Sequence, residues 1–298
     1  MTGTGSVRAG LRSVELPTLP LFRRGKVRDT FDLGDRLLMV ATDRISAFDC
    51  VLPDLIPDRG RVLTTMSRHW FGETLGISPN HLRADDPSAI PAESFQALAG
   101  RMMFVAKAER IDIECVVRGR LAGSGWQEYQ DGGTLADDPL PAGLAFGSFL
   151  SEPRFTPATK NDIGHDENIS RAQLADMVGR ELAERLETVS QTLFQFGTER
   201  FRQAGLVLVD TKFEFGMVDG ELTLIDEVLT PDCCRLWALS DAETELQPHG
   251  FDKQPVRDYL VSTGWDRLPP APALPETLLR ETRGRYLEVC RRITGIDL

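Results

Sequence analysis

The chain has 298 residues, a formal net charge of −11, 41% hydrophobic residues and 27% charged residues. Such a chain is long enough for one large or two moderate domains of ordinary globular composition. Its acidic balance argues against non-specific binding to nucleic acid, because phosphate backbones are held by an excess of lysine and arginine. No apolar run approaches the roughly 20 residues that span a bilayer, and the opening residues lack the apolar core of a signal peptide. We therefore expect a cytoplasmic protein with neither a nucleic-acid nor a membrane partner.

The cysteines are odd in number and include no Cys-x-x-Cys pair, so they support neither a disulfide framework nor a zinc site. The vicinal pair Cys233 and Cys234 has no neighbouring resolving motif. We expect all of them to be reduced thiols.

A basic stretch at residues 23–29 is the first candidate for a binding site. It precedes an apolar strand predicted at residues 36–41 and reads as strand, turn, strand. Gly25 would allow a close approach to the backbone, and Lys26 and Arg28 would share one strand face. This pattern fits a nucleotide phosphate chain, although a basic hairpin edge is an equally common explanation.

Polar residues follow the strand at residues 36–41 directly, in the stretch Thr42-Asp-Arg-Ile-Ser-Ala-Phe-Asp49. Loops at the end of a buried strand often carry function on a rigid support. Asp43, Arg44, Ser46 and Asp49 are therefore candidate substrate ligands, with ordinary turn and capping roles as the alternative.

Two strands are predicted at residues 101–108 and 111–118, with a possible hinge between lobes at Glu109 and Arg110. Arg118 and Arg120 then lead into a glycine-rich loop that contains Ser124. Arginine forks and a serine hydroxyl suit a phosphate monoester, whereas solvated arginines on a flexible loop would give the same pattern.

The next motif is a polar run around Lys160, after which Ser170 is predicted to cap one long helix that ends near Arg202. A further amphipathic helix is predicted at residues 276–294, after a proline-rich linker.

A predicted hairpin at residues 206–228 concentrates charge on one strand face. Asp210, Lys212 and Glu214 alternate along the first strand and should project together, and Asp219-Gly220 is a strong signal for a two-residue turn. A solvated hairpin could show the same alternation, but acids that converge on one face also suit Mg2+ attended by phosphate. A regular turn pairs Glu214 with Ile225 and puts Glu227 on the site face, so Asp226 would need a bulge or a longer loop to reach it. Arg235 follows after a short loop.

Together these motifs resemble, in the same order, those of the phosphoribosylaminoimidazole-succinocarboxamide synthase (SAICAR synthetase) family, and the resemblance runs from about Arg23 to Tyr259. The two most specific signatures are Asp-x-Lys-x-Glu-Phe-Gly at residues 210–216 and Arg-x-Arg-x-Ala-Gly-Ser at residues 118–124. The other matching motifs are Gly25-Lys-Val-Arg-Asp, the stretch of residues 42–49, Lys160-Asn-Asp with His165-Asp166, Asp226-Glu and Asp232-Cys-Cys-Arg-Leu-Trp.

The resemblance implies an α+β fold. A mainly antiparallel N-terminal lobe at residues 1–110 would bind nucleotide, a larger ATP-grasp-like lobe at residues 111–298 would carry the metal and ribotide sites, and ATP would lie between them. It implies an ATP-dependent ligase of de novo purine biosynthesis that joins L-aspartate to the carboxylate of carboxyaminoimidazole ribotide (CAIR) through an acyl phosphate. ATP and Mg2+ would be its cofactors, CAIR and aspartate its small-molecule partners, and the protein would be a monomer or a homodimer.

The resemblance also implies residue roles. ATP would be contacted by Gly25, Lys26, Arg28 and Glu114, and Mg2+ would be bound by Glu214 and Asp226. The ribotide phosphate would be held by Arg118, Ser124 and Arg235, the imidazole would be contacted by Asp210 and Lys212, and Lys160 would contact the reacting phosphate. A lid over the substrate and aspartate would include Asp43, Arg44, Ser46 and Asp49. Two alternatives share part of the pattern. A small-molecule kinase would also use lysine and metal-binding carboxylates, and a catalytically silent nucleotide sensor would bind ATP without turnover.

Overall fold

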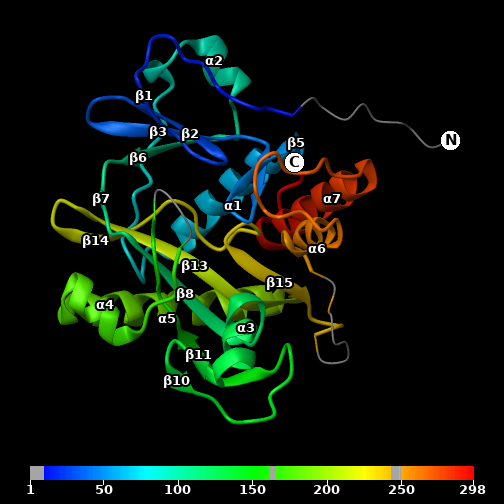
Figure 1. Ribbon diagram of the computed structural model, residues 1–298. Coiled ribbons are helices and arrows are strands. Elements are labelled where there is room, and N and C mark those ends of the chain that lie inside the picture. The colour runs from blue at the N-terminus through cyan, green and yellow to red at the C-terminus, as the bar shows by residue number, and fades with distance from the viewer. Residues whose placement is uncertain (1–9, 162–165, 243–247, 249) are drawn as a thin grey trace. The chain divides into compact units, whose positions relative to one another are not determined.

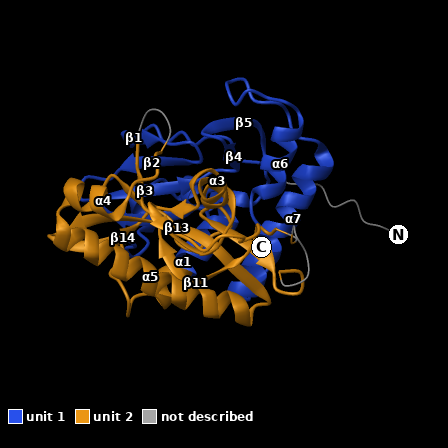
Figure 2. Cartoon of the chain, turned by 60° about the horizontal axis from the view of Figure 1, so that its bottom comes forward, with its two compact units in different colours: residues 1–69, 82–107, 252–298 blue, residues 70–81, 108–251 orange. Residues whose placement is uncertain are grey.

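The computed structural model describes residues 10–161, 166–242, 248 and 250–298. The chain forms two compact units, one made of residues 1–69, 82–107 and 252–298 and the other of residues 70–81 and 108–251 (Figure 2). Each unit combines helices with antiparallel strands, which confirms the expected α+β class (Figure 1). Within the described ranges, no helix is both long and apolar enough to cross a membrane.

The first unit contains a four-stranded antiparallel sheet in the order β1-β2-β3-β6 and a separate hairpin of β4 and β5. Its sheet packs Phe31, Leu38, Val40 and Phe104 into an apolar cluster. Its elements are β1 (Leu21–Arg24), β2 (Arg28–Asp32), β3 (Arg36–Ala41), β4 (Arg44–Ala47), β5 (Cys50–Leu55), α1 (Arg59–Glu73, which continues into the second unit), the 3-10 helix η1 (Pro87–Ala89), α2 (Ala92–Ala97), β6 (Met102–Ala106), α6 (Gln254–Ser262) and α7 (Glu276–Thr294).

The placement of residues 252–298 differs from the sequence expectation of one boundary near residue 110. These C-terminal residues belong to the first unit because α6 contributes Val256 and Leu260 to an apolar cluster with Ile45 and Leu52 of the β4–β5 hairpin. An amphipathic helix can bury its apolar face against any apolar partner, so its periodicity did not specify which lobe it joins.

The second unit is built on a seven-stranded sheet with the path β11-β8-β13-β14, to which β7, β12 and β15 add. Strand β13 is the longest and pairs with β7, β8, β14 and β15, so it lies at the centre of this unit. The elements are β7 (Glu109–Arg110), β8 (Ile113–Arg120), α3 (Gly123–Gly132), β9 (Thr134–Leu135), β10 (Asp138–Pro139), β11 (Phe149–Phe155), β12 (Ala158–Thr159), α4 (Arg171–Val178), α5 (Arg180–Gln203), β13 (Leu206–Val218), β14 (Glu221–Ile225) and β15 (Cys234–Ala238).

The single long helix predicted from Ser170 onward is two helices in the structure. Ser170 caps α4 as expected, in a capping box with Gln173, but Gly179 has φ 84° and ψ 147° and separates α4 from α5. Glycine adopts such a conformation without a Cβ clash, and apolar spacing continues across the break. Helix α5 then packs against β13, β8 and β11.

Helix α1 offers a test of packing with a matched control in the same helix. At Gly60 an added Cβ would lie 2.3 Å from the backbone oxygen of Ala41, whereas at Gly72 nothing lies within 4 Å. We predict that Gly60→Ala lowers the free energy of unfolding by roughly 2 to 3 kcal/mol, because strand and helix must separate. Gly72→Ala should instead raise it by up to about 1 kcal/mol through helix propensity. Urea denaturation measures both; equal effects would show that the helix start is not tightly packed.

Candidate active site

Three charged residues of β13 project from one face of the sheet, as the alternation predicted. Strand β13 pairs with β8 in an uninterrupted register, in which Asp210 lies opposite Arg118, Lys212 opposite Val116 and Phe213 opposite Cys115. Phe213 is fully buried, whereas Lys212 contacts Glu214 two residues along the strand. Because side chains alternate between faces, the charged positions of β8 and β13 gather on the same side.

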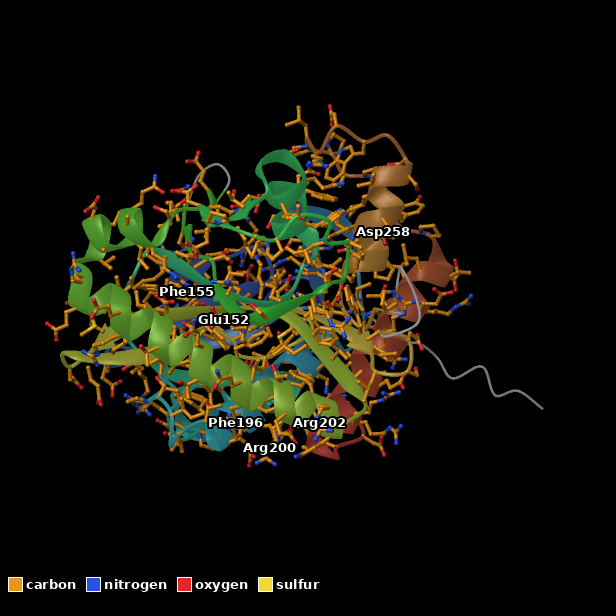
Figure 3. All side chains as sticks on the ribbon, turned by 90° about the horizontal axis from the view of Figure 1, so that it is seen from below. Glu152, Phe155, Phe196, Arg200, Arg202 and Asp258 are labelled. Carbon is orange, nitrogen blue, oxygen red and sulfur yellow. The ribbon has the colours of Figure 1, made fainter. Side chains whose placement is uncertain are left out.

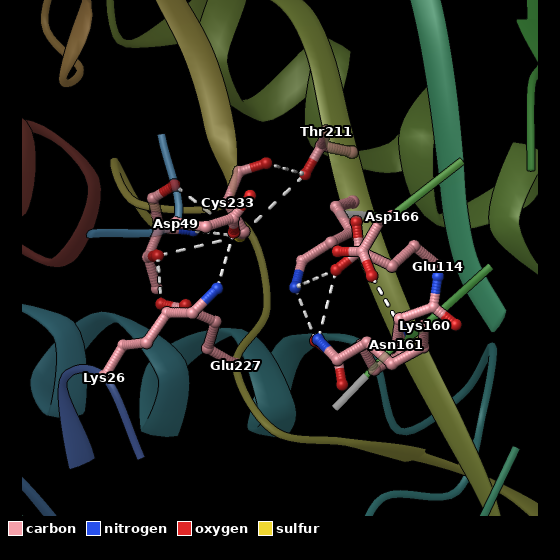
Figure 4. Close-up of polar contacts among 12 residues, drawn as sticks. Lys26, Asp49, Glu114, Lys160, Asn161, Asp166, Thr211, Glu227 and Cys233 are labelled. Atoms are coloured by element: carbon pink, nitrogen blue, oxygen red, sulfur yellow. Dashed lines mark hydrogen bonds and ion pairs between the residues drawn. The ribbon is translucent and has the colours of Figure 1, made fainter. Parts of the chain in front are cut away.

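Two lysines and two glutamates form a closed cluster there. Lys160 Nζ lies 3.1 Å from Glu114 Oε1 and 2.6 Å from Glu214 Oε1 (Figure 4). Lys212 Nζ lies 3.0 Å from the same oxygen of Glu114 and also bonds Glu214 Oε1. Each charge in the cluster therefore contacts two charges of the opposite sign.

The cluster fixes the protonation states of its members. Burial alone would lower the pKa of Lys212, but the charges of Glu214, Glu114 and Asp226 outweigh it and raise that pKa well above its usual value. Burial likewise opposes ionisation of Glu214, yet Lys212 and Lys160 hold its pKa well below the usual range. Both side chains are thus charged at neutral pH.

A second charged group lies at the other end of the same strand face. Arg118 donates to Thr156 Oγ1 at 3.0 Å, to Asp210 Oδ2 at 3.3 Å and to Ser124 Oγ at 2.9 Å. Arg235 Nη1 donates to the same Asp210 oxygen at 2.5 Å. One carboxylate thus orients two arginines beside a serine hydroxyl.

Helix α3 begins at this arginine pair. Its N-cap is Ala122, whose side chain makes no capping hydrogen bond, so the first backbone N–H groups of the helix are available to an anion. A Cβ at Gly123, which has φ 54°, would lie 2.5 Å from Arg235 Nη2. Glycine is therefore needed for the guanidinium to lie against the helix start. Two arginines, a serine and the start of a helix thus lie together, and these are the donor groups that suit a phosphate monoester.

The β13–β14 hairpin has the regular two-residue turn that its sequence predicted, with Glu214 opposite Ile225 and Val218 opposite Glu221. Strand β14 ends at Ile225, however, and Asp226 takes a left-handed φ of 66°. Strand alternation therefore no longer decides which way Asp226 and Glu227 point. The charge of Asp226 acts on Lys212, while buried Glu227 accepts a hydrogen bond from Thr230 Oγ1.

The basic motif of the first unit differs from its predicted geometry. Lys26 and Arg28 do not share a strand face, because the N–H of Gly25 bonds the oxygen of Arg28 at 2.8 Å and closes a tight turn, so β2 begins only at Arg28. Lys26 lies in that turn, largely exposed, and pairs with Asp49 Oδ1 at 2.5 Å.

Asp43 and Arg44 are buried and take part in the architecture of the first unit. Asp43 accepts bonds from Arg101 at 2.6 and 2.9 Å and from the backbone of α1. Arg44 donates to the backbone oxygens of Gly25 and Lys26 at 3.0 and 3.1 Å. Both side chains thus take part in these intramolecular bonds, and Arg44 bonds the turn that contains Lys26; substrate binding by Asp43 and Arg44 stays a prediction.

The remaining lid candidates lie on the β4–β5 hairpin. Ser46 is half-buried on β4, and Asp49 is exposed at the turn. Phe48 and Asp49 form that turn with φ 51° and 62°, although neither is glycine. Left-handed residues with a Cβ are uncommon and gather at functional sites. Asp162 and His165 of the polar run lie outside the described residues.

Sequence reasoning missed the roles of Thr156 and Thr230. Both are buried hydroxyls bonded to charged side chains, Thr156 to Arg118 and Thr230 to Glu227. A threonine in a strand or a loop is ordinary, so only the three-dimensional contacts identify these two.

The charged face suits a metal that arrives with its substrate. Among the described residues, there is no group of three or more His, Cys, Asp or Glu side chains that could hold a metal ion. Mg2+ in nucleotide enzymes commonly uses one or two carboxylates together with phosphates and water. Glu214 lies opposite Ile225, the residue before Asp226, so this part of the hairpin carries the two carboxylates that such a requirement needs.

Comparison with known proteins gives one consistent family. The SAICAR synthetase profile matches residues 21–272. The chain is 47% identical to the phosphoribosylaminoimidazole-succinocarboxamide synthase of Elusimicrobium minutum, over 92% of this chain and 96% of that protein. It is also 47% identical to the enzyme of the same name from Syntrophobacter fumaroxidans, over 95% of this chain and 96% of that protein.

A solved structure agrees over nearly the whole chain. The SAICAR synthase of Saccharomyces cerevisiae, in a structure titled as complexed with SAICAR, superposes with a TM-score of 0.86 at 35% identity, covering 97% of this chain and 99% of that one. The order of motifs, the fold and the relatives agree, and the chain belongs to the SAICAR synthetase family of ATP-dependent ligases of purine biosynthesis.

Proposed function

We propose that this chain joins L-aspartate to the carboxylate of CAIR, with ATP converted to ADP and phosphate. The observation that carries the proposal is the charged face of β13. It holds a group of two arginines and a serine around Asp210 and a lysine–carboxylate cluster at Glu214. Asp210 and Glu214 are four residues apart on the strand, which corresponds to roughly 13 Å at about 3.3 Å per residue. That separation suits a ribotide with its phosphate at one end and its reacting carboxylate at the other.

The reaction requires activation of that carboxylate, because an amine cannot expel oxide from it. We propose that a carboxylate oxygen attacks the γ-phosphorus of ATP as the bond to the ADP oxygen breaks, which forms an acyl phosphate. The aspartate amine then attacks the acyl carbon, loses a proton and displaces inorganic phosphate. Lys160 and Lys212 are placed to offset the negative charge on the transferred phosphoryl group.

At the other end, Arg118, Ser124 and Arg235 would hold the ribotide phosphate, with Asp210 orienting both guanidinium groups. Bidentate arginines favour a phosphate dianion and fix its position, which orients the rest of the substrate.

Mg2+ would be held by Glu214 and Asp226 and would supply charge neutralisation for the phosphates of ATP. We retain Glu114 as a residue near the nucleotide, because it shares both lysines with Glu214. In the first unit, we propose Gly25, Lys26 and Arg28 as contacts of the ATP phosphates and Ser46 and Asp49 as substrate contacts, on the strength of the motif resemblance.

Product analysis tests the proposal directly. Purified protein with ATP, Mg2+, aspartate and CAIR should give SAICAR, ADP and phosphate in equal amounts, and no product when any one substrate is withheld. ADP release that does not need aspartate would indicate a kinase instead, and ATP binding without ADP release would indicate a nucleotide sensor.

Replacement of Arg235 tests the phosphate site. We predict that Arg235→Gln lowers kcat/KM for CAIR roughly 30- to 1000-fold, the equivalent of about 2 to 4 kcal/mol for a charged hydrogen-bonded contact, while KM for ATP changes little. Arg202→Gln is the control, since Arg202 lies on the exposed surface near the end of α5 (Figure 3). Equal kcat/KM values for CAIR in the wild type and Arg235→Gln would exclude this residue from the site.

Replacement of Glu214 tests metal binding. Glu214→Gln keeps the shape of the side chain but removes its charge, so the Mg2+ concentration for half-maximal activity should rise at least several-fold. Glu221→Gln changes an exposed acid of the same hairpin and should leave that concentration unchanged. A Glu214→Gln enzyme with an unaltered Mg2+ titration would contradict metal ligation by Glu214.

A further inference from the structure

The loop at residues 226–233 joins β14 to β15 and connects the two charged groups of the site. Asp226 opens the loop and is one of the acids whose charge acts on Lys212. Arg235 lies just beyond its other end and bonds Asp210. Any change in the path of this loop would therefore displace a residue in each group.

Two residues of the loop have a left-handed backbone. Asp226 and Leu229 have φ values of 66° and 51°, although both carry a Cβ. Left-handed conformations of this kind are unfavourable for residues other than glycine and persist where the neighbouring structure fixes them. The loop therefore needs an internal constraint.

Thr230 provides that constraint. Its hydroxyl, which is fully buried, donates to Glu227 Oε2 at 2.5 Å and accepts from the N–H of Asp232 at 3.2 Å. Its backbone oxygen accepts from the N–H of Cys234 at 2.9 Å, and its backbone N–H donates to Cys233 Sγ at 3.3 Å. One residue thus bonds both halves of the loop.

The constrained loop is also fixed to β13 beside the cluster. The N–H of Lys212 donates to the backbone oxygen of Cys233 at 3.0 Å, and Thr211 Oγ1 donates to the same oxygen at 3.3 Å. Figure 4 shows Thr211 and Cys233 facing one another, with Glu227 on the same loop. The position of the loop is therefore transmitted to the strand that carries Lys212.

We propose that Thr230 is a positioning residue for the ligase reaction, and that its hydroxyl, anchored on the buried carboxylate of Glu227, fixes the loop between Asp226 and β15 so that Arg235 bonds Asp210. This inference rests on the function proposed above. It gives Glu227 the task of orienting Thr230, and leaves Asp226 as the residue of the pair that serves the site.

Thr230→Val tests the proposal, because valine keeps the shape of threonine but cannot donate a hydrogen bond. We expect kcat/KM for CAIR to fall roughly 10- to 100-fold, the effect of losing one hydrogen bond to a charged group. The Mg2+ concentration for half-maximal activity should rise in the same variant. Thr230→Ser keeps the hydroxyl and should restore both values to within a few-fold of the wild type.

Thr223→Val is the matched control. Thr223 is also buried, on β14, but its hydroxyl bonds the backbone oxygen of Glu221, away from the loop. We expect it to change thermal stability without changing either kinetic value. Wild-type kinetics in Thr230→Val, or equal kinetic losses in Thr230→Val and Thr223→Val, would overturn the proposal.

Amide hydrogen exchange of residues 226–233 gives a readout that does not depend on turnover. Exchange should quicken in Thr230→Val and return to the wild-type rate in Thr230→Ser; unchanged exchange in Thr230→Val would overturn the constraint. A wild-type protein that makes no SAICAR would defeat the proposed function alone, since the exchange result would still stand. If Thr230→Val does not fold, Glu227→Leu, which cannot accept the hydrogen bond, replaces it; faster exchange is expected in the loop, and the wild-type rate would contradict the anchor.

Discussion

The candidate site depends on one set of ion pairs, those between two lysines and two glutamates: Lys160, Lys212, Glu114 and Glu214. Removing ions from water is costly, and a buried ion is tolerated only when opposite charges and hydrogen bonds compensate it. In this cluster each lysine contacts both glutamates, so the charges offset one another in the absence of substrate. The same arrangement leaves two cations in position for an incoming anion, which is what phosphoryl transfer requires.

The fold provides three members of the cluster from two paired strands, whereas Lys160 follows directly after β12. Glu114 and Glu214 belong to neighbouring strands, and Lys212 lies on the same strand face as Glu214. Strands packed against helix α5 deform little, so the charges are held more firmly than loop residues would be. Arg118 extends the same face toward Asp210 and Arg235.

Strained backbone occurs where the site needs chain direction to change sharply. The β4–β5 turn at Phe48 and Asp49 and the loop that begins at Asp226 both use left-handed residues other than glycine. Neighbouring contacts hold each of them, such as the pair of Asp49 with Lys26 and that of Thr230 with Glu227. Phe48, Asp49 and Asp226 are thus left-handed residues that lie in motifs shared with the family, although the chain has left-handed residues elsewhere as well.

The sequence by itself determined the elements whose signals are local. The two-residue turn at Asp219-Gly220, the shared face of Asp210, Lys212 and Glu214, and the final helix at residues 276–294 follow from short-range rules of turn chemistry and periodicity. Only the tertiary structure decided that Asp43 and Arg44 are buried in structural bonds, and that residues 252–298 join the first unit. It also decided that Asp226 escapes the alternation of β14 by leaving the strand with a left-handed φ. Those outcomes depend on partners far away in the sequence, because burial and loop path are set by what packs against a residue rather than by the residue itself.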